Sequence, residues 1–283
     1  MRRGLVAVTA ALVAAVGCGA GERSDLVVEG TPPTTPYTGR LDLATRTLDT
    51  HTPQALPAES GAAGRALECD GQISDGGGPD GWSSGDGGDT PEDGLRLFFD
   101  MFQPQVPHSG YRVEREADGR VLYSYDVGGR TKVAVVVAED QQGRPGWGPE
   151  TNASCDPAEL PAAFSDSLGL EIWTDRDGHR VATTTLTSHA GAEHCGWERA
   201  HFLGTGGAED YRQYVRDPDG VLASGLLAAP YDADVRMPAD ARDTGYRYGH
   251  WRLWLTKDRR TAYVRTPEGV EAWPLAKRAV ACK

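Results

Sequence analysis

The cysteines constrain the fold of this chain more than any other feature of its sequence. Five occur in 283 residues, and Cys18 differs from the others because it directly follows an apolar N-terminal run. The other four form an even set, which is typical of disulfide-bonded proteins in an oxidising compartment. Cys69 and Cys155 are 86 positions apart, and Cys195 and Cys282 are 87 positions apart. We therefore expect the pairs Cys69–Cys155 and Cys195–Cys282, each closing one half of the domain. Four buried thiols or a crossed pairing are the alternatives.

Residues 1–17 have the pattern of a signal peptide. Arg2 and Arg3 supply positive charge, and Leu5–Val16 is an apolar run of about a dozen residues, shorter than the roughly 20 that a membrane-spanning helix needs. Small residues stand directly before Cys18, as in a bacterial lipobox. We expect cleavage before Cys18 and acylation of Cys18, with palmitate among the acyl groups. Several acyl chains together would bind the protein durably to a membrane. The predicted product is a lipoprotein at the outer face of the cell membrane, and plain secretion is the alternative.

The charge of the chain disfavours nucleic-acid binding. The formal net charge is −12, and the sequence has no basic stretch that could bind the phosphates of a nucleic acid. Besides the membrane, which the lipid would contact, the expected partner is a cell-wall polymer or another protein of the envelope.

Beyond the signal, the sequence divides into a tether and two lobes. Residues 18–60 include the proline-rich stretch Thr31–Pro36, which predicts a flexible, extended tether. We place an N-terminal α+β lobe at 61–160 and a C-terminal β-rich lobe at 161–283. Tripeptide Gly110–Arg112 recurs as Gly245–Arg247, which together with the cysteine spacing indicates two related lobes. Chance similarity between strands, within one continuous unit, is the alternative.

An acidic, glycine-rich segment follows the first lobe's cysteine. Clustered carboxylates on a turn-rich backbone are what a calcium site requires, and Asp75, Asp80 and Asp86 are the weak candidates. The segment has no EF-hand spacing, so a solvated loop is the favoured interpretation. We expect no other cofactor and no other metal.

A helix is predicted at 91–103. Thr90 is a suitable N-cap and Pro91 suits the first helical position. Four apolar residues then recur with the helical period and form one buried stripe, namely Leu95, Phe98, Phe99 and Phe102. By the same capping logic, a second short helix starts after Asp156 and runs to Ser167.

The rest of the folded part shows the period-two patterns and glycine-rich turns of antiparallel strands. We expect strands at 111–114, 121–127, 131–139, 170–174, 180–187, 197–203, 211–216, 221–226, 251–256, 261–265 and 270–273. The valine-rich run at 133–137 predicts a central strand. The fold class is therefore α+β with mainly antiparallel sheet, and an all-β sandwich or propeller-like fold is the alternative.

No catalytic motif stands out in the chain. Ser188-His189 and His194-Cys195 are similar to parts of the contiguous Ser-His-Gly-Cys motif of L,D-transpeptidases, but here residues 190–193 separate them. The histidines lack the helical spacing of a zinc site, and the paired carboxylates lie in turns. We expect a non-enzymatic binding or interaction module. A hydrolase of envelope polysaccharide or peptide and a secreted protease inhibitor are the alternatives.

Two tryptophans in one predicted strand are the candidate ligand-binding residues. Trp251 and Trp254 are three positions apart, so they point to opposite faces of a strand. At least one should lie outside a single core, as in sheets that bind carbohydrate or protein through exposed aromatic rings. The alternative is that both faces of the sheet are covered.

The C-terminal half resembles a group of uncharacterised exported proteins of actinobacteria. The likeness covers roughly residues 155–283, and the segments that carry it are Gly169–Gly178, Glu193–Trp197, Tyr214–Gly220, Asp243–Arg247, Ala262–Val264 and Trp273–Pro274. The resemblance implies an extracytoplasmic address. It implies no activity and no catalytic residues.

Overall fold

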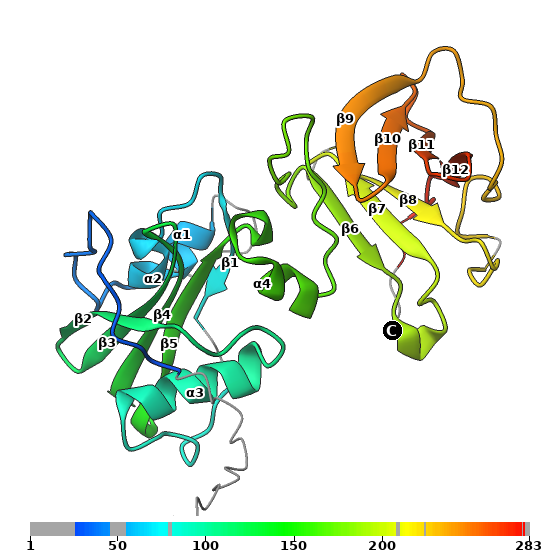
Figure 1. Ribbon diagram of the computed structural model, residues 1–283. Coiled ribbons are helices and arrows are strands. Elements are labelled where there is room, and N and C mark those ends of the chain that lie inside the picture. Colours follow the sequence, from blue (N-terminus) through cyan, green and yellow to red (C-terminus); the bar gives the residue numbers. More distant parts are fainter. Residues whose placement is uncertain are drawn as a thin grey trace, which may run out of the picture.

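The computed structural model describes residues 26–45, 55–78, 81–207, 210–223, 225–278 and 280, and Figure 1 shows them as two lobes. The first lobe comprises α1 (Leu56–Glu59), α2 (Gly61–Ala66), β1 (Ile73–Gly77), α3 (Pro91–Phe102), β2 (Arg112–Ala117), β3 (Arg120–Val127), β4 (Arg130–Gln141), β5 (Arg144–Cys155), η1 (Pro157–Glu159) and α4 (Ala162–Ser167). The second comprises β6 (Leu186–Ala190), η2 (Glu193–Cys195), β7 (His201–Thr205), β8 (Arg212–Arg216), β9 (Arg242–Tyr248), β10 (Trp251–Leu255), β11 (Thr261–Arg265) and β12 (Val270–Pro274).

All three sheets are antiparallel, which confirms a fold of mainly antiparallel sheet with few short helices. The first lobe has one sheet in the order β1-β5-β4-β3-β2, and the second has two, β6-β7-β8 and β12-β11-β10-β9. Among the described helices, none has the length and hydropathy required to span a bilayer. That the two lobes are related to each other stays a prediction.

The predicted helix at 91–103 is α3, and its start is set by a capping box. Thr90 Oγ1 accepts a hydrogen bond from the amide of Asp93 at 3.2 Å, and the Asp93 carboxylate accepts one from the amide of Thr90 at 3.1 Å. The stripe of Leu95, Phe98 and Phe99 is buried against the valines of the sheet. The helix therefore covers one face of the first sheet, as Figure 1 shows.

Strand β4 is the central strand of this sheet, as its valine-rich run predicts. Val133, Val135 and Val137 face the α3 side, and Ala134 and Val136 face the α2 side. Both faces are covered, which is why the run is apolar throughout instead of alternating.

Its neighbour β5 was not predicted, because Pro145, Gly146, Gly148 and Pro149 disfavour a strand. Pro149 is tolerated because it stands where the register with β4 shifts. At such a bulge the ladder of hydrogen bonds is interrupted, so the missing N–H of proline costs little. Gly148 packs so closely on Trp82 that a Cβ atom there would overlap the indole ring. Proline and glycine thus occur in this strand because of tertiary contacts, which local strand propensity does not reveal.

Part of the predicted 18–60 tether is packed on the first lobe. Leu26 and Val27 pair with Tyr111 through a parallel bridge and backbone hydrogen bonds, and Leu41 is buried in the cluster on the α2 face. Leu26, Val27 and Leu41 pack on the cores of this lobe, whereas Val28 is 38% exposed. Residues 46–54 lie outside the described part.

The second lobe is a sandwich of its two sheets around Trp173, Leu203, Tyr214, Leu253 and Trp273. Strands β10, β11 and β12 match the predicted strands at 251–256, 261–265 and 270–273 within a residue or so. Strand β9 was not predicted. The predicted hairpin of 170–174 and 180–187 is reduced to an isolated bridge, and its second part continues into β6 only at the end.

The predicted strand at 221–226 is absent from the described residues of that stretch, and the carboxylate of Asp217 explains why. Its two oxygens accept hydrogen bonds from the amides of Val221 at 2.9 Å and Leu222 at 3.1 Å. These amides are therefore satisfied by a side chain and need no partner strand.

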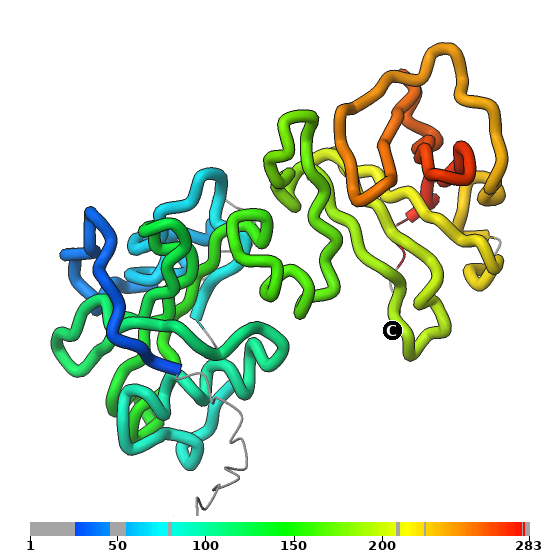
Figure 2. Tube along the Cα trace, in the orientation of Figure 1, coloured from blue at the N-terminus to red at the C-terminus, as the bar shows by residue number. Residues whose placement is uncertain are grey.

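The two lobes join just after α4, as the trace in Figure 2 shows. Phe164 of α4 belongs to the core of the first lobe, although our division at residue 160 assigns this helix to the second. Across the junction, Arg180 of the second lobe donates to the carbonyl of Leu160 and, at 3.0 Å, to Ser165 Oγ.

Candidate functional site

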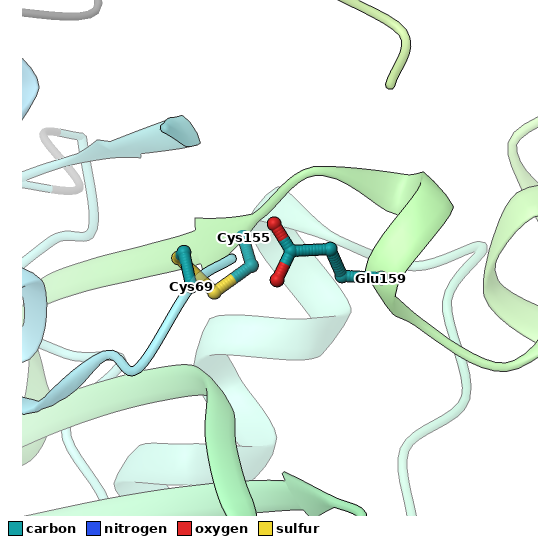
Figure 3. A group of neighbouring side chains, drawn as sticks. All are labelled: Cys69, Cys155 and Glu159. Atoms are coloured by element: carbon teal, nitrogen blue, oxygen red, sulfur yellow. A yellow bond between two sulfur atoms is a disulfide. The ribbon is translucent and has the colours of Figure 1, made fainter. Parts of the chain in front are cut away.

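The disulfide between Cys69 and Cys155 confirms the first predicted pair. Glu159 lies beside it, and Figure 3 shows its carboxylate directed toward the sulfurs. Because the two sulfurs are bonded to each other, they offer no thiolates to a metal ion. Cys18 and Cys282 lie outside the described residues, so lipidation of Cys18 and the bridge Cys195–Cys282 stay predictions.

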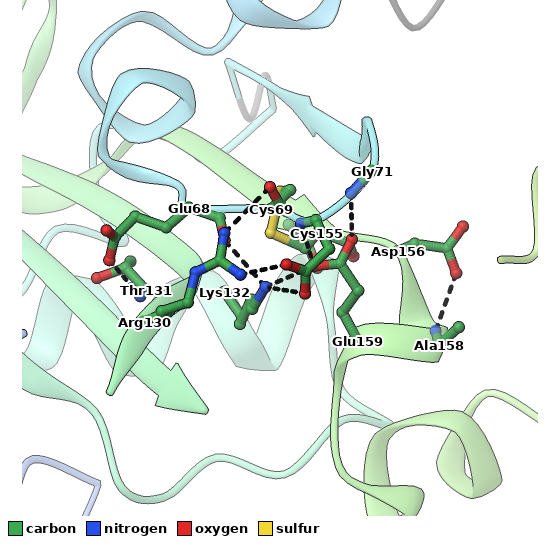
Figure 4. A network of polar contacts seen from close by, with 12 residues as sticks. Glu68, Cys69, Gly71, Arg130, Thr131, Lys132, Cys155, Asp156, Ala158 and Glu159 are labelled. Carbon is green, nitrogen blue, oxygen red and sulfur yellow. Dashed lines mark hydrogen bonds and ion pairs between the residues drawn. A yellow bond between two sulfur atoms is a disulfide. The ribbon is translucent and has the colours of Figure 1, made fainter. Parts of the chain in front are cut away.

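A buried lysine ties this disulfide to the sheet, as Figure 4 shows. The Lys132 side chain is 4% exposed, and its Nζ donates to the Glu68 carbonyl at 2.9 Å, to Asp70 at 3.0 Å and to Glu159 at 2.6 Å. Glu159 also accepts from the amides of Asp70 and Gly71 at 2.7 and 2.9 Å. Every charge in this network has a partner, so it anchors the chain around Cys69 and presents no vacant site.

Two of the calcium candidates, Asp75 and Asp86, lie in the described part of the chain, and each has a hydrogen-bond partner. Asp75 accepts a hydrogen bond from Gln103 at 3.2 Å, and Asp86 accepts one from the amide of Ser83 at 2.6 Å. Neither belongs to a group of three or more metal-ligand side chains in the described part of the chain, and Asp80 lies outside that part. A calcium site therefore stays a prediction.

One further acidic group, Asp175 with Asp177 and His179, has close ligand atoms. An Asp175 oxygen accepts from the amides of Asp177 and His179, both at 2.9 Å, as in an Asx turn. This turn explains why the three side chains lie close together, and no bound ion is needed to explain it.

Trp251 and Trp254 do lie on opposite faces of β10. Trp251 points inward with Leu253 and Leu255 and packs on the sandwich core. Trp254 points to the outer face of the four-stranded sheet, where the guanidinium of Arg265 lies 5.7 Å from its ring centroid. The two tryptophans therefore belong to different surroundings.

Beside Trp251, on the inner side of the sheet, lies a half-buried Glu–His pair. His201 Nδ1 lies 2.8 Å from Glu171 Oε1, and Ser188 Oγ donates to Glu171 Oε2 at 2.5 Å. A carboxylate only accepts, so Nδ1 of His201 carries the proton. The His201 ring also makes an edge contact with Trp251, at 5.0 Å between centroids.

The charge of Glu171 is stabilised by these contacts. Burial raises the pKa of Glu171, and hydrogen bonds from His201 and Ser188 lower it by more, so the pKa lies below its ordinary value. The side chains of Glu171 and His201 are 12% and 19% exposed, so both are partly accessible to solvent.

A second ion pair links the two sheets. Arg216 of β8 donates to both oxygens of Glu271 of β12, at 2.9 and 3.1 Å, and Trp273 Nε1 donates to Glu271 at 2.8 Å. Burial and the neighbouring Glu271 carboxylate raise the pKa of Tyr231 to about 12, so its hydroxyl stays protonated. These residues form a polar and aromatic network.

The outer face carries a row of arginines. Arg247 of β9 stands directly opposite Arg252 of β10, which stands directly opposite Arg265 of β11. Directly opposed residues of antiparallel strands project from the same face. Arg252 and Arg265 are exposed and Arg247 is half-buried. We call Arg247, Arg252 and Arg265 the arginine row.

None of these three arginines forms an ion pair with a carboxylate in the described part of the chain. The ion pairs of the second lobe that involve arginine use Arg176, Arg199, Arg216 and Arg259. Next to the row on the same face, Trp254 stands opposite Tyr263. The carboxylate opposite Trp254, that of Asp243, faces Arg176 at 3.8 Å.

Two tight turns hold the arginine row in register. Tyr248 pairs with Trp251 around a turn whose Gly249 has φ +54°, a conformation that glycine adopts without strain. At the other end of β10, Asp258 accepts hydrogen bonds from Thr256 Oγ1 at 2.7 Å and the amide of Arg260 at 3.2 Å. These local contacts fix which residues of the three strands stand side by side.

Comparison with protein-family models, with curated proteins and with solved structures finds no match for this chain. Of the sequence candidates, Trp254 lies on the outer face and Trp251 on the inner face, and both are half-buried. The arginine row was missed, since its members are dispersed along the sequence. Their alternation with the inward-facing Tyr246, Leu253 and Val264 is the signal that could have placed them on one outer face.

Proposed function

We propose that this chain is a membrane-tethered extracytoplasmic lipoprotein that binds an anionic polymer of the cell envelope. The binding surface is the outer face of the sheet β9–β12. The arginine row beside Trp254 is the observation that supports this function.

Three aligned arginines without carboxylate partners need an explanation. Like charges directly opposite each other on a sheet destabilise it, and here they occur in a chain whose net charge is −12. A bound polyanion removes the repulsion. The guanidinium fork recognises phosphate and carboxylate through paired hydrogen bonds.

The dimensions and the aromatic neighbours favour a sugar-containing polymer. Adjacent strands lie about 4.8 Å apart, so the outer two arginines of the row are about 10 Å apart, a span that suits repeated charges along an extended chain. Beside the row, the half-buried Trp254 and Tyr263 add aromatic surface of the kind against which sugar rings pack. The proposed ligand class is therefore a phosphate- or uronate-bearing glycan.

Binding of purified anionic wall glycan, measured by isothermal titration calorimetry, tests the proposal. The double variant Arg252→Gln, Arg265→Gln should lose at least roughly tenfold in affinity, since each charge-assisted pair contributes more than a neutral hydrogen bond. Raising the salt concentration should weaken the native protein more than the variant. Arg212→Gln is the matched control, because Arg212 is an exposed arginine on β8 of the other sheet. Equal affinity of native and double-variant protein would remove the proposal.

The tether has its own test. Intact mass spectrometry of the native product should show a species that begins at Cys18 and carries the mass of three acyl groups. A product that retains Met1 would contradict the anchored location.

A hydrolase is the second candidate, and the Glu171–His201 pair is the observation that favours it. A carboxylate that holds Nδ1–H of a histidine leaves Nε2 free to act as a base, which is the geometry that general base catalysis uses. Turnover of envelope polysaccharide or peptide that is lost in Glu171→Gln, but not in Arg252→Gln, would place this function ahead of binding. A protease inhibitor has no comparable observation in its favour.

A further inference from the structure

The first lobe contains a small, mainly apolar pocket between helices α3 and α4 and the sheet. Its volume is about 80 Å³, and it lies between the C-terminal half of α3, the ends of β4 and β5, and α4. The apolar lining comprises Phe98, Phe99, Val133, Leu160, Phe164 and Leu168. Leu168 is 41% exposed and therefore marks an apolar mouth at the surface.

Three of the polar side chains around this pocket already have partners. Gln103 donates to Asp75 at 3.2 Å, Asn152 donates to the carbonyl of Gly77 at 3.3 Å, and Ser154 donates to the carbonyl of Cys155 at 2.9 Å. These three groups therefore need no polar ligand. Tyr111, which also lines the pocket, is fully buried, and its hydroxyl has no hydrogen-bond partner among the described residues. Burial raises the pKa of this hydroxyl far above the usual range, so the hydroxyl is neutral. The rest of the lining is mainly apolar.

Its size excludes most ligands. Drug-sized molecules occupy pockets of roughly 300–1,000 Å³, and an engineered cavity of about 150 Å³ takes a single benzene ring. An 80 Å³ space with aromatic walls accepts only a slim, unbranched group, and its apolar lining disfavours water.

We infer that this pocket binds the terminal carbons of an unbranched alkyl chain that enters past Leu168. The pocket lies in the first lobe and the proposed glycan-binding face in the second, but the sources of the alkyl chain rest on the proposed membrane tether.

Two sources supply such a chain. The first is a lipid of the membrane. The second is the acyl group predicted on Cys18, eight positions before Leu26, whose carbonyl accepts a hydrogen bond from the amide of Tyr111 at 3.0 Å. Eight residues reach at most about 27 Å, so the protein's own lipid is within range of the pocket.

Calorimetric titration of the full chain carrying Cys18→Ser with hexanoate, octanoate and decanoate tests the site. Affinity should rise about fourfold per added methylene and level off once the pocket is full. Leu168→Asp should weaken decanoate binding at least roughly tenfold, because a charge then stands at the mouth. Met101→Asp is the matched control, since Met101 is 42% exposed on α3 and does not line the pocket. It should bind within about twofold of the parent.

A comparison with the native, acylated protein separates the two sources. Decanoate binding by Cys18→Ser but not by the native protein assigns the pocket to its own acyl group. Binding by both assigns it to a membrane lipid. No saturable binding at any chain length, or equal losses in Leu168→Asp and Met101→Asp, overturns the inference. Arg252→Gln should bind decanoate normally, which keeps this result separate from glycan binding.

Discussion

Asp156, at the end of the first lobe, holds Thr183 of the second through two hydrogen bonds. The Thr183 amide donates to one carboxylate oxygen at 3.0 Å and its hydroxyl donates to the other at 2.9 Å. Asp156 is 2% exposed and also accepts from the amide of Ala158 at 2.9 Å. One buried carboxylate thus caps η1 and joins the lobes.

Replacing this carboxylate should loosen the junction. Asp156→Ala leaves several buried donors without an acceptor, so we expect a loss of roughly 2–3 kcal/mol in the free energy of unfolding, measured by urea denaturation. Thr183→Val, which removes only the hydroxyl, should cost less. A change below about 0.5 kcal/mol in Asp156→Ala, the range of an ordinary surface substitution, would show that the junction does not depend on this contact.

The disulfide of the first lobe should contribute strongly to stability. It joins Cys69 and Cys155 across 86 positions, and the chain-entropy estimate for such a loop is about 4–5 kcal/mol. Replacing both residues, Cys69→Ser and Cys155→Ala, should lower the urea midpoint accordingly. An unchanged midpoint would mean that the Lys132 network alone holds this region.

The half-buried Glu171 should make the second lobe sensitive to acid. Its pKa in the folded state lies below the ordinary value of 4.5, so the folded protein binds fewer protons there than the unfolded chain. The stabilisation is present above pH 4.5 and is lost as the pH falls through the folded pKa. Unfolding followed by tryptophan fluorescence between pH 6 and pH 3 should show a shallower acid limb in Glu171→Gln. Identical limbs in both proteins would be evidence against this role.

Strand β5 depends on a glycine at position 148. Gly148→Ala places a methyl group against the Trp82 ring, and overpacking of this kind costs about 1–3 kcal/mol. Gly85→Ala is the control, because an added Cβ there meets nothing within 4 Å. Thermal unfolding should separate the two variants, and equal melting temperatures would contradict the packing of Trp82 on β5.

Local patterns predicted the elements whose causes are local. The cap at Thr90, the stripe that begins at Leu95 and the valine run around Val135 act within a few residues, so α3 and the central strand could be derived from the sequence. Strand β5 could not, because Pro149 and Gly148 are accommodated by a bulge and by Trp82, far away in the chain.

The sequence by itself determined the signal-like N-terminus, the cysteine spacing, α3 and the opposite orientation of Trp251 and Trp254. Only the tertiary structure decided that Arg247, Arg252 and Arg265 align, that Glu171 meets His201, and that a pocket opens beside Leu168. The physical reason is that capping and periodicity depend on neighbours along the chain. Cross-strand register and gaps between helices depend instead on how distant segments pack. The arginine row is assembled by such packing, so the overall negative charge of the chain does not reveal it.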